Sequence, residues 1–283
     1  MQKKIETVKT LLDALPFIKK FNNEIIVVKY GGSAQTSPQL KEKFAQDILL
    51  LYLVGLKPVI VHGGGKRITE LLDKLDIDTK FIDGQRVTSK DVMRVVEMVL
   101  SGEINKEIVS LLNDFGAKAI GISGKDAHFM KAKAKDFSKF GLTGTIESIN
   151  PTVINNLIAE KFVPVIAPIA SSKEMSHPGF NINADLAASE IAKALGAQKI
   201  IFLTDTPGVL DNNKNLLSTL TSNDVNDLKD NGTISGGMVP KVDACLSAIY
   251  GGVDKAHIID GRVEHALLLE LLTSDGVGTE IIR

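Results

Sequence analysis

The stretch IIVVKYGGS at residues 25–33 decides the fold of this chain. Its β-branched run at 25–28 predicts a buried strand, and two glycines follow where a segment of helical periodicity begins. The stretch VIVHGGG at 59–65 repeats this arrangement. A strand that ends in glycines and opens a helix lets backbone N–H groups face an anion. The two stretches therefore predict that phosphate and a second anionic ligand meet at one edge of a sheet.

The rest of the chain continues this alternation of short β-rich runs and helical segments. Such alternation predicts a parallel sheet with helices on both faces. We expect strands at 25–29, 58–62, 117–123, 162–167, 199–204 and 255–259. We expect helices at 38–53, 66–75, 90–115, 152–160, 184–195, 221–230, 239–250 and 264–272, with a break of the long middle helix near Gly102. Alternating residues at 126–147 predict a β-hairpin excursion.

Ahead of the first strand, apolar residues recur at helical spacing. They are Ile5, Val8, Leu11, Leu12 and Leu15, with Lys and Glu between them. Pro16 is expected to kink or end this helix. An amphipathic helix must cover its apolar stripe. It packs either on its own domain or on another subunit.

Composition narrows the class of protein. The 283 residues suit one large α/β domain or two lobes that share a sheet, and 44% hydrophobic residues allow a sizeable core. A net charge of -1 gives no case for nucleic-acid or membrane-surface binding. The single Cys245 excludes an intrachain disulfide and fits a reducing compartment. The apolar run at 48–56 is far shorter than the ~20 residues of a membrane span, and the first residues lack a signal-peptide pattern, so we expect a cytoplasmic protein.

Two familiar nucleotide motifs fail here. A P-loop needs Gly five positions before its last Gly and Ser or Thr after its Lys, but Gly65-Lys66 has Ile60 and Arg67 at those positions. Gly124-Lys125 fails in the same way. The glycines at 63–65 also lack the third glycine of a dinucleotide fingerprint.

Several polar side chains suggest chemistry at the strand ends. Lys29 ends a strand predicted to be buried, where a lysine is costly unless it is paired or points into a site. Lys241 opens a helix, where a bound anion would offset the unfavourable dipole. Asn181 and Asp185 flank a helix start, and Arg86 is a candidate fork for a carboxylate. Each also has an ordinary alternative: a snorkelling or surface lysine, helix capping, or a surface arginine.

Six segments taken in order resemble the amino acid kinase family, and within it the branch that phosphorylates N-acetyl-L-glutamate. They are KYGGSA (29–34), VHGGG (61–65), G-x-RVT (84–88), GISGKD (121–126), NINAD (181–185) and GGM-x-x-K (236–241). The resemblance implies a three-layer α/β/α sandwich with a mainly parallel central sheet. It also implies a helix at 1–22 ahead of a kinase domain at 23–283. In that domain an N-lobe, about 23–195, would hold the acceptor site and the dimerisation surface. A C-lobe, about 196–283, would hold the ATP site.

The resemblance further implies phosphoryl transfer from ATP, with Mg²⁺, to the γ-carboxylate of N-acetyl-L-glutamate in arginine biosynthesis. Lys29 and Lys241 would stabilise the transferring group, and Asp185 would orient both lysines. The acceptor would be held by Gly64, Gly65, Arg86 and Asn181. Nucleotide contacts would come from Gly31, Gly32, Asp205, Thr206, Pro207, Gly208, Val209, Leu210, Thr233, Ile234 and Ser235. No protein ligand to a metal is expected, and a carboxylate nucleophile that is already ionised needs no general base.

The two ends of the chain resemble those of arginine-inhibited hexameric members of the family. This implies a trimer of dimers, joined through the N-terminal helix, and inhibition by L-arginine. The implied arginine contacts are Lys199, His257, Glu270 and Gly276. Three residues depart from the pattern: Phe17 stands where many relatives have Tyr, Gln35 where Met is common, and Pro207 where a small residue is usual. The first removes a hydrogen bond expected at the arginine site, and the others bear on ligand affinity.

Other functions remain open on the sequence alone. One is a different amino acid kinase, such as one acting on glutamate, aspartate or carbamate. Another is a non-catalytic regulatory subunit that binds arginine or nucleotide. Loss of Lys29, Lys241 or Asp185 would indicate the regulatory subunit, and all three are present.

Overall fold

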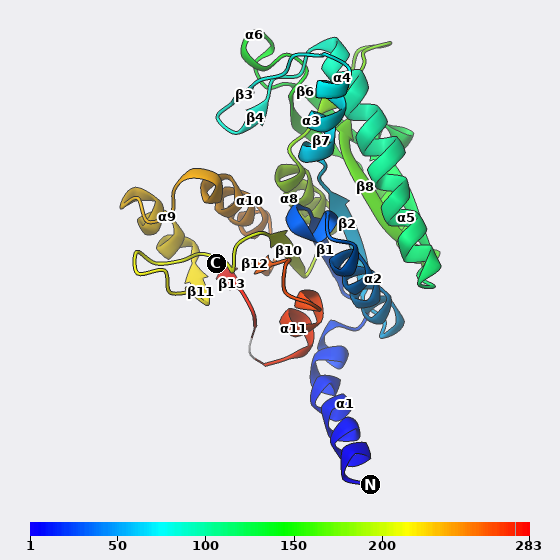
Figure 1. The fold of residues 1–283 in the computed structure, drawn as a ribbon, viewed down its shortest axis with the longest axis vertical. Coiled ribbons are helices and arrows are strands. Elements are labelled where there is room, and N and C mark those ends of the chain that lie inside the picture. The colour runs from blue at the N-terminus through cyan, green and yellow to red at the C-terminus, as the bar shows by residue number, and fades with distance from the viewer. Residues whose placement is uncertain (275) are drawn as a thin grey trace.

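The computed structural model describes residues 1–274 and 276–283, without the side chain of residue 7. A large sheet crosses the body in the strand order β11-β13-β12-β10-β1-β2-β8-β5, with β9 paired to β8 (Figure 1). Its strands are β1 (Ile25–Tyr30), β2 (Lys57–His62), β5 (Ala119–Gly124), β8 (Val163–Ala170), β9 (Phe180–Asn181), β10 (Lys199–Thr204), β11 (Thr219–Thr221), β12 (Lys255–Asp260) and β13 (Thr279–Ile282). The pairs β12–β13 and β8–β9 are antiparallel and the other pairs are parallel. The prediction of a mainly parallel sheet is confirmed.

Two groups of helices flank the sheet and complete the α/β sandwich. Helices α8 and α10 pack on each other and on strands β1, β10 and β12, whereas α2 packs on β2, α5 on β5 and β8, and α11 on β12. The helices are α1 (Gln2–Phe21), α2 (Pro38–Leu53), α3 (Gly65–Lys74), α4 (Lys90–Glu97), α5 (Asn105–Asp114), α6 (Phe137–Phe140), α7 (Thr152–Ala159), α8 (Ala184–Leu195), α9 (Ser222–Asp230), α10 (Val239–Tyr250) and α11 (Ala266–Leu272). Short 3₁₀ turns are η1 (Gly32–Gln35), η3 (Asp126–His128) and η4 (Gly236–Met238).

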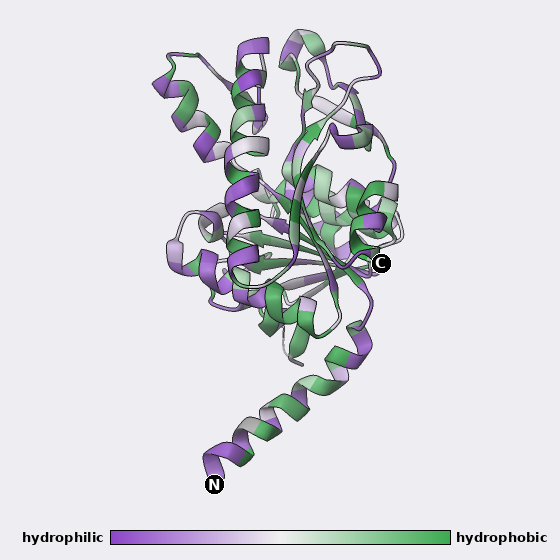
Figure 2. Ribbon diagram, turned by 90° about the vertical axis from the view of Figure 1, so that its right-hand side faces the viewer, coloured by the Kyte–Doolittle hydropathy of each residue, from purple (hydrophilic) through white to green (hydrophobic). Residues whose placement is uncertain are grey.

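The register of the central strands brings the two glycine stretches together. Lys29 pairs with Val61, and Tyr30 pairs with His62, in parallel strands β1 and β2. The carboxyl ends of these strands therefore lie side by side, as the sequence predicted. Both strands are almost fully buried. Figure 2 shows that the strands crossing the body are mostly hydrophobic.

The long middle helix does not break at Gly102. Instead, α4 passes through a π-helical segment, η2 (Met98–Ile104), directly into α5. A π-helix absorbs an extra residue without leaving the helical path, which is how this run remains continuous where a break was expected.

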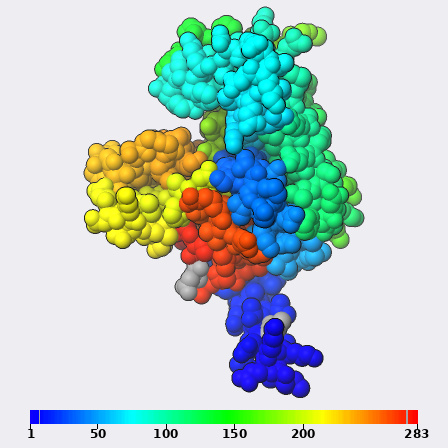
Figure 3. Space-filling model, in the orientation of Figure 1, coloured from blue at the N-terminus to red at the C-terminus, as the bar shows by residue number. Residues whose placement is uncertain are grey.

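Helix α1 projects away from the body (Figures 1 and 3). It continues through Pro16, so of the two expected outcomes, a kink or an end, the end is excluded. Phe21 is buried and Phe17 packs partly against the core, which holds the last turn in place although a proline removes one helix hydrogen bond. The earlier stripe is exposed: Leu11 is 66% and Leu12 58% accessible. Within this chain the stripe is therefore mostly uncovered.

Several short elements extend the predicted fold. The excursion expected at 126–147 contains the antiparallel strands β6 (Met130–Ala134) and β7 (Gly144–Ile149). A second hairpin, β3 (Phe81–Ile82) and β4 (Gln85–Arg86), was not predicted. Among the helices of the described residues, none is long and apolar enough to cross a membrane.

Candidate functional site

The centre of the site is a carboxylate between two ammonium groups. Asp185, in the first turn of α8, lies with its Oδ1 3.0 Å from Lys29 Nζ and its Oδ2 3.3 Å from Lys241 Nζ. Lys29 comes from the end of β1 and Lys241 from the first turn of α10. These residues, predicted from separate parts of the sequence, therefore meet at one place.

The charge state of Asp185 follows from these partners. Burial disfavours its ionised form, but Lys29 and Lys241 outweigh burial and hold the pKa of the carboxyl below its usual value. The carboxylate therefore stays negative near neutral pH and offsets part of the charge of the two lysines. The lysines are fixed in position while a net positive charge remains to face an anion.

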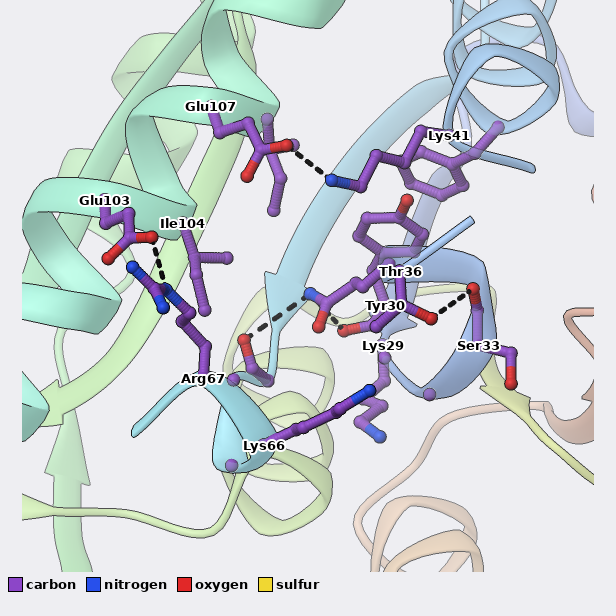
Figure 4. A pocket seen from close by; sticks show the side chains of 18 of the residues that line it. Lys29, Tyr30, Ser33, Thr36, Lys41, Lys66, Arg67, Glu103, Ile104 and Glu107 are labelled. Carbon is purple, nitrogen blue, oxygen red and sulfur yellow. Dashed lines mark hydrogen bonds and ion pairs between the residues drawn. The ribbon is translucent and has the colours of Figure 1, made fainter. Parts of the chain in front are cut away.

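The two glycine loops lie beside Lys29. A cavity of about 640 Å³ is lined by Lys29, by Gly31 and Gly32 of the first loop, by residues 63–65 of the second, and by Asp205. Figure 4 shows Lys29 and Lys66 on its wall. Gly32 has φ +66°, and an added Cβ there would lie 2.6 Å from Asp205 Oδ1. A side chain would not fit there, so the loop backbone remains open to the cavity.

A smaller cavity adjoins the second loop. Its volume is about 200 Å³, and its lining includes Gly64, Gly65, Arg86 and Asn181. The structure therefore brings together all four residues assigned to the acceptor. The Arg86 side chain lies over the Phe81 ring, 4.7 Å from its centroid, and donates to Gly65 O at 2.9 Å and to Thr69 Oγ1 at 2.8 Å. Burial lowers the pKa of Arg86 from its usual high value, and the group keeps its charge.

Two residues that were not predicted shape this cavity. Asn181 Nδ2 donates to Thr88 Oγ1 at 3.1 Å, and Thr88 Oγ1 lies 2.9 Å from Thr143 Oγ1. Thr143 Oγ1 in turn donates to Arg86 O. Thr88 stood inside the GQRVT motif, which was a usable signal. Thr143 comes from the hairpin and carries no signal in its local sequence.

The predicted nucleotide residues at 205–210 and 233–235 differ in their contacts. Asp205 faces the first glycine loop, where its Oδ1 accepts from Ser33 N–H at 2.6 Å. Val209 and Ile234 are buried, and their backbone N–H groups bond inside the protein, to Thr279 Oγ1 and to Leu228 O. The remaining residues, Thr206, Pro207, Gly208, Leu210, Thr233 and Ser235, lie on the turns around these two. Their nucleotide role stays a prediction.

A separate cavity of about 460 Å³ lies between the end of α1 and α11. It is lined by Phe17, Lys199, Glu270, Gly276 and Glu280, among others. Burial lowers the pKa of Lys199 to about 8. His257 is buried behind this wall, with Nδ1 2.6 Å from Glu270 Oε1. Three of the four residues assigned to arginine therefore line one cavity, and the fourth supports it.

In the part of the chain that the structure describes, side chains do not form a cluster that could together bind a metal ion. There, no group of three or more His, Cys, Asp or Glu side chains is arranged to hold an ion. The large cavity is lined by the cations Lys29, Lys41, Lys66 and Arg67 and by the carboxylates Glu70, Glu103, Glu107 and Asp205. Lys29 and Lys66 lie beside the glycine loops, where a cation suits phosphate oxygens.

Comparison with known proteins assigns the class of this protein. The model of the amino acid kinase family matches residues 24–260, and the chain belongs to that family. It is 75% identical over 281 residues to "Acetylglutamate kinase" of Sulfurimonas denitrificans, covering 99% of both chains. It is 72% identical over 282 residues to the protein of that name from Nitratiruptor, covering 100% of this chain and 99% of the other.

A solved structure shares the fold at low identity. It is N-acetylglutamate synthase from Neisseria gonorrhoeae complexed with coenzyme A and N-acetyl-glutamate, with a TM-score of 0.86 and 21% identity. The match covers 98% of this chain and 63% of that one. At this identity the likeness extends to the fold alone.

Proposed function

We propose that this protein transfers the γ-phosphoryl group of ATP to the γ-carboxylate of N-acetyl-L-glutamate, as a step of arginine biosynthesis. The observation that carries the proposal is the pairing of Asp185 with both Lys29 and Lys241 beside the two glycine loops. The high identity to proteins named acetylglutamate kinase supports the choice of acceptor.

In this reaction the protein needs mainly to align the reacting groups and to stabilise negative charge. A γ-carboxylate has a reference pKa near ~4.3, so it is already a nucleophile at neutral pH without a general base. Phosphoryl transfer passes through a loose transition state whose charge lies on the phosphoryl oxygens. Lys29 and Lys241 offset that charge, while Asp185 fixes both ammonium groups and backbone N–H groups of the glycine loops align the reacting groups.

We also propose that Mg²⁺ accompanies the nucleotide. Among the described residues no group of three or more His, Cys, Asp or Glu side chains is arranged to hold an ion, which favours an ion held mainly by ATP oxygens. When bound, such an ion offsets phosphate charge. Asp205, whose Oδ1 accepts from Ser33 N–H of the first glycine loop, is our candidate for contact with the hydrated ion.

Recognition of the acceptor would fall to the smaller cavity. Arg86 offers a planar fork for a carboxylate, and Asn181 offers an amide for the polar part of the ligand. The Gly64 and Gly65 backbone would lie where the acceptor carboxylate meets the phosphoryl group. Residues 205–210 and 233–235 would hold the nucleotide from the other side.

Regulation by L-arginine is proposed on a separate observation, the cavity beside α1. Its carboxylates Glu270 and Glu280 suit a guanidinium or an ammonium, and it lies next to Phe17 at the end of α1. We propose that copies of the exposed α1 stripe pair and join dimers into a hexamer. Arginine would then act where the oligomer joins the kinase body.

The decisive experiment measures acylphosphate formation, trapped as hydroxamate, from ATP with N-acetyl-L-glutamate, L-glutamate or L-aspartate, with and without L-arginine. Turnover of N-acetyl-L-glutamate alone supports the proposed reaction, and its reduction by arginine supports the regulatory site. Turnover of another acid, or of none, would refute the proposed acceptor.

A further inference from the structure

The carbonyl oxygen of Gly63 accepts hydrogen bonds from two side chains. His62 Nδ1 lies 3.0 Å from it and Gln35 Nε2 lies 3.4 Å from it. A carbonyl oxygen has two lone pairs, so these two donors satisfy it completely. Neither side chain lines the acceptor cavity, although Gln35 lies on the wall of the large cavity. The pair nevertheless acts on the backbone of the second glycine loop.

The proton on the His62 ring is placed by a third residue. Asn105 Nδ2 donates to Val165 O at 2.9 Å and lies 3.2 Å from His62 Nε2. Asn105 Oδ1 accepts from Lys106 Nζ, which fixes the orientation of the amide. Because Asn105 presents a donor, His62 Nε2 must accept, and the ring proton lies on Nδ1. Burial lowers the pKa of His62 to about 4, so the ring is neutral at working pH.

Gln35 also connects the two glycine loops directly. Its Nε2 donates to Tyr30 O at 3.1 Å as well as to Gly63 O, and Gly63 N donates to Tyr30 O at 2.9 Å. Figure 4 shows this region between Tyr30 and Lys66. One amide group therefore holds the end of β1 and the end of β2 at a fixed separation.

Peptide planarity transmits this constraint to the ligand side. In a trans peptide, the carbonyl of Gly63 and the N–H of Gly64 point in opposite directions. Donors that fix the Gly63 carbonyl thus fix the direction of the Gly64 N–H. Gly64 lines both the large cavity and the acceptor cavity.

The π-helical segment closes the remaining side of the loop. A Cβ on Gly64 would lie 2.4 Å from Ile104 Cδ1 and 2.6 Å from Leu100 Cδ2, and both side chains come from η2. Asn105 follows η2 at once. Such π-segments are frequent at functional sites, and this one places the residues that hold the loop.

We propose that Gln35 and His62 are positioning residues that clamp the Gly63–Gly64 peptide and aim the Gly64 N–H at the phosphoryl group in transfer. The role rests on the proposed phosphoryl transfer. It concerns alignment in the transition state and not the affinity for the acceptor, because neither side chain lines the acceptor cavity.

The test replaces Gln35, because this residue is half-buried and can be substituted with less damage to the core than the buried His62. Gln35→Met keeps the length and removes the donor, whereas Gln35→Glu keeps the shape and sets a carboxylate against two carbonyl oxygens. The matched control is Gln39→Met, on the exposed start of α2. We expect Gln35→Met to lower kcat about three- to tenfold and Gln35→Glu to lower it further, with KM for N-acetyl-L-glutamate within about twofold.

Hydrogen exchange of the peptide spanning residues 59–66 supplies a readout without turnover. Faster exchange in both Gln35 variants, with a melting temperature like that of Gln39→Met, would support the clamp. Unchanged exchange, or a kcat for Gln35→Met equal to that of the wild type, would overturn it. If the wild-type protein forms no acylphosphate, the proposed function fails, and exchange alone then decides whether the clamp exists.

Discussion

Lys29 and Asp185 face each other at 3.0 Å across the end of the central sheet, one from strand β1 and the other from the first turn of helix α8. Both side chains are about nine-tenths buried, with exposed fractions of 11% and 10%. Asp185 also contacts Lys241, and the dipole of α8 favours its negative charge. The contact therefore joins the sheet and two helices at the proposed reaction centre.

Replacing Asp185 with Asn removes the charge that holds the two lysines and keeps the shape. We expect Asp185→Asn to lower kcat by about 10²- to 10³-fold, because misplaced ammonium groups stabilise the transition state poorly. The measurement is initial-rate kinetics of hydroxamate formation. The control is Asp243→Asn, which breaks the exposed ion pair with Lys229. An equal fall in both variants would contradict the assigned role.

Lys241 should act on the rate and hardly on the binding of the acceptor. It reaches Asp185 from α10, outside the acceptor cavity. We expect Lys241→Ala to lower kcat at least about 10²-fold while KM for N-acetyl-L-glutamate changes less than about threefold. Lys229→Ala, which removes another ion-paired lysine, serves as the control. Unchanged turnover in Lys241→Ala would refute its role.

The central features of the fold were predictable because they follow from local pattern. The run at 25–28 and the glycines after it specify a buried strand and an open loop in consecutive residues. Strands such as β11 (Thr219–Thr221) and β9 (Phe180–Asn181) were missed because two or three residues are too few for periodicity to show. They exist because neighbouring strands offer free hydrogen-bonding groups.

The structure brings together those predicted site residues whose charge alone suggested a role, and their roles stay a prediction. Lys29, Lys241 and Asp185 are charged, and a charged side chain at the end of a buried strand or at a helix start needs a partner or a ligand. Thr143 and Asn105 carry no such signal, because their roles depend on partners far away in the chain. Asn105, for example, contacts His62 and Val165, which only folding brings near.

The exposed apolar stripe of α1 predicts that charged substitutions on it will weaken the proposed oligomer. Leu11 and Leu12 are both more than half exposed, so covering them on another copy would remove apolar surface from water. We expect the double substitution Leu11→Glu and Leu12→Glu to reduce a hexamer to dimers in light scattering. Lys9→Glu, on the polar part of the helix, should leave the mass unchanged. A wild-type protein that is already dimeric would defeat this prediction.

Glu270 should govern the response to arginine. Its Oε2 accepts from Val277 N–H at 3.0 Å and its Oε1 meets His257, so the carboxylate is held toward the cavity beside α1. His257 and Lys199 oppose the effect of burial and lower its pKa, which keeps Glu270 ionised. We expect Glu270→Gln to raise the arginine concentration for half inhibition at least about tenfold. The exposed Glu264→Gln is the control, and an unchanged arginine response in Glu270→Gln would reject the site.

Asp47 on α2 makes the stability of the fold depend on pH. It is 2% exposed, and burial raises the pKa of its carboxyl to about 6 although His265 Nδ1 lies 2.6 Å from Oδ1. The unfolded carboxyl has a pKa near ~3.9, so between about pH 4 and about pH 6 the folded state binds more protons. The stabilisation from this group is thus complete below about pH 4 and is lost as the pH rises through about 6.

Asp47→Asn removes this titration and keeps the shape of the side chain. The urea midpoint of the variant should therefore rise relative to that of the wild type between pH 4.5 and pH 7, because only the wild type must bury a growing negative charge. The exposed Asp114→Asn should show no such trend. A constant difference between Asp47→Asn and the wild type across this range would mean that His265 compensates the buried charge fully, and that Asp47 does not set the pH dependence.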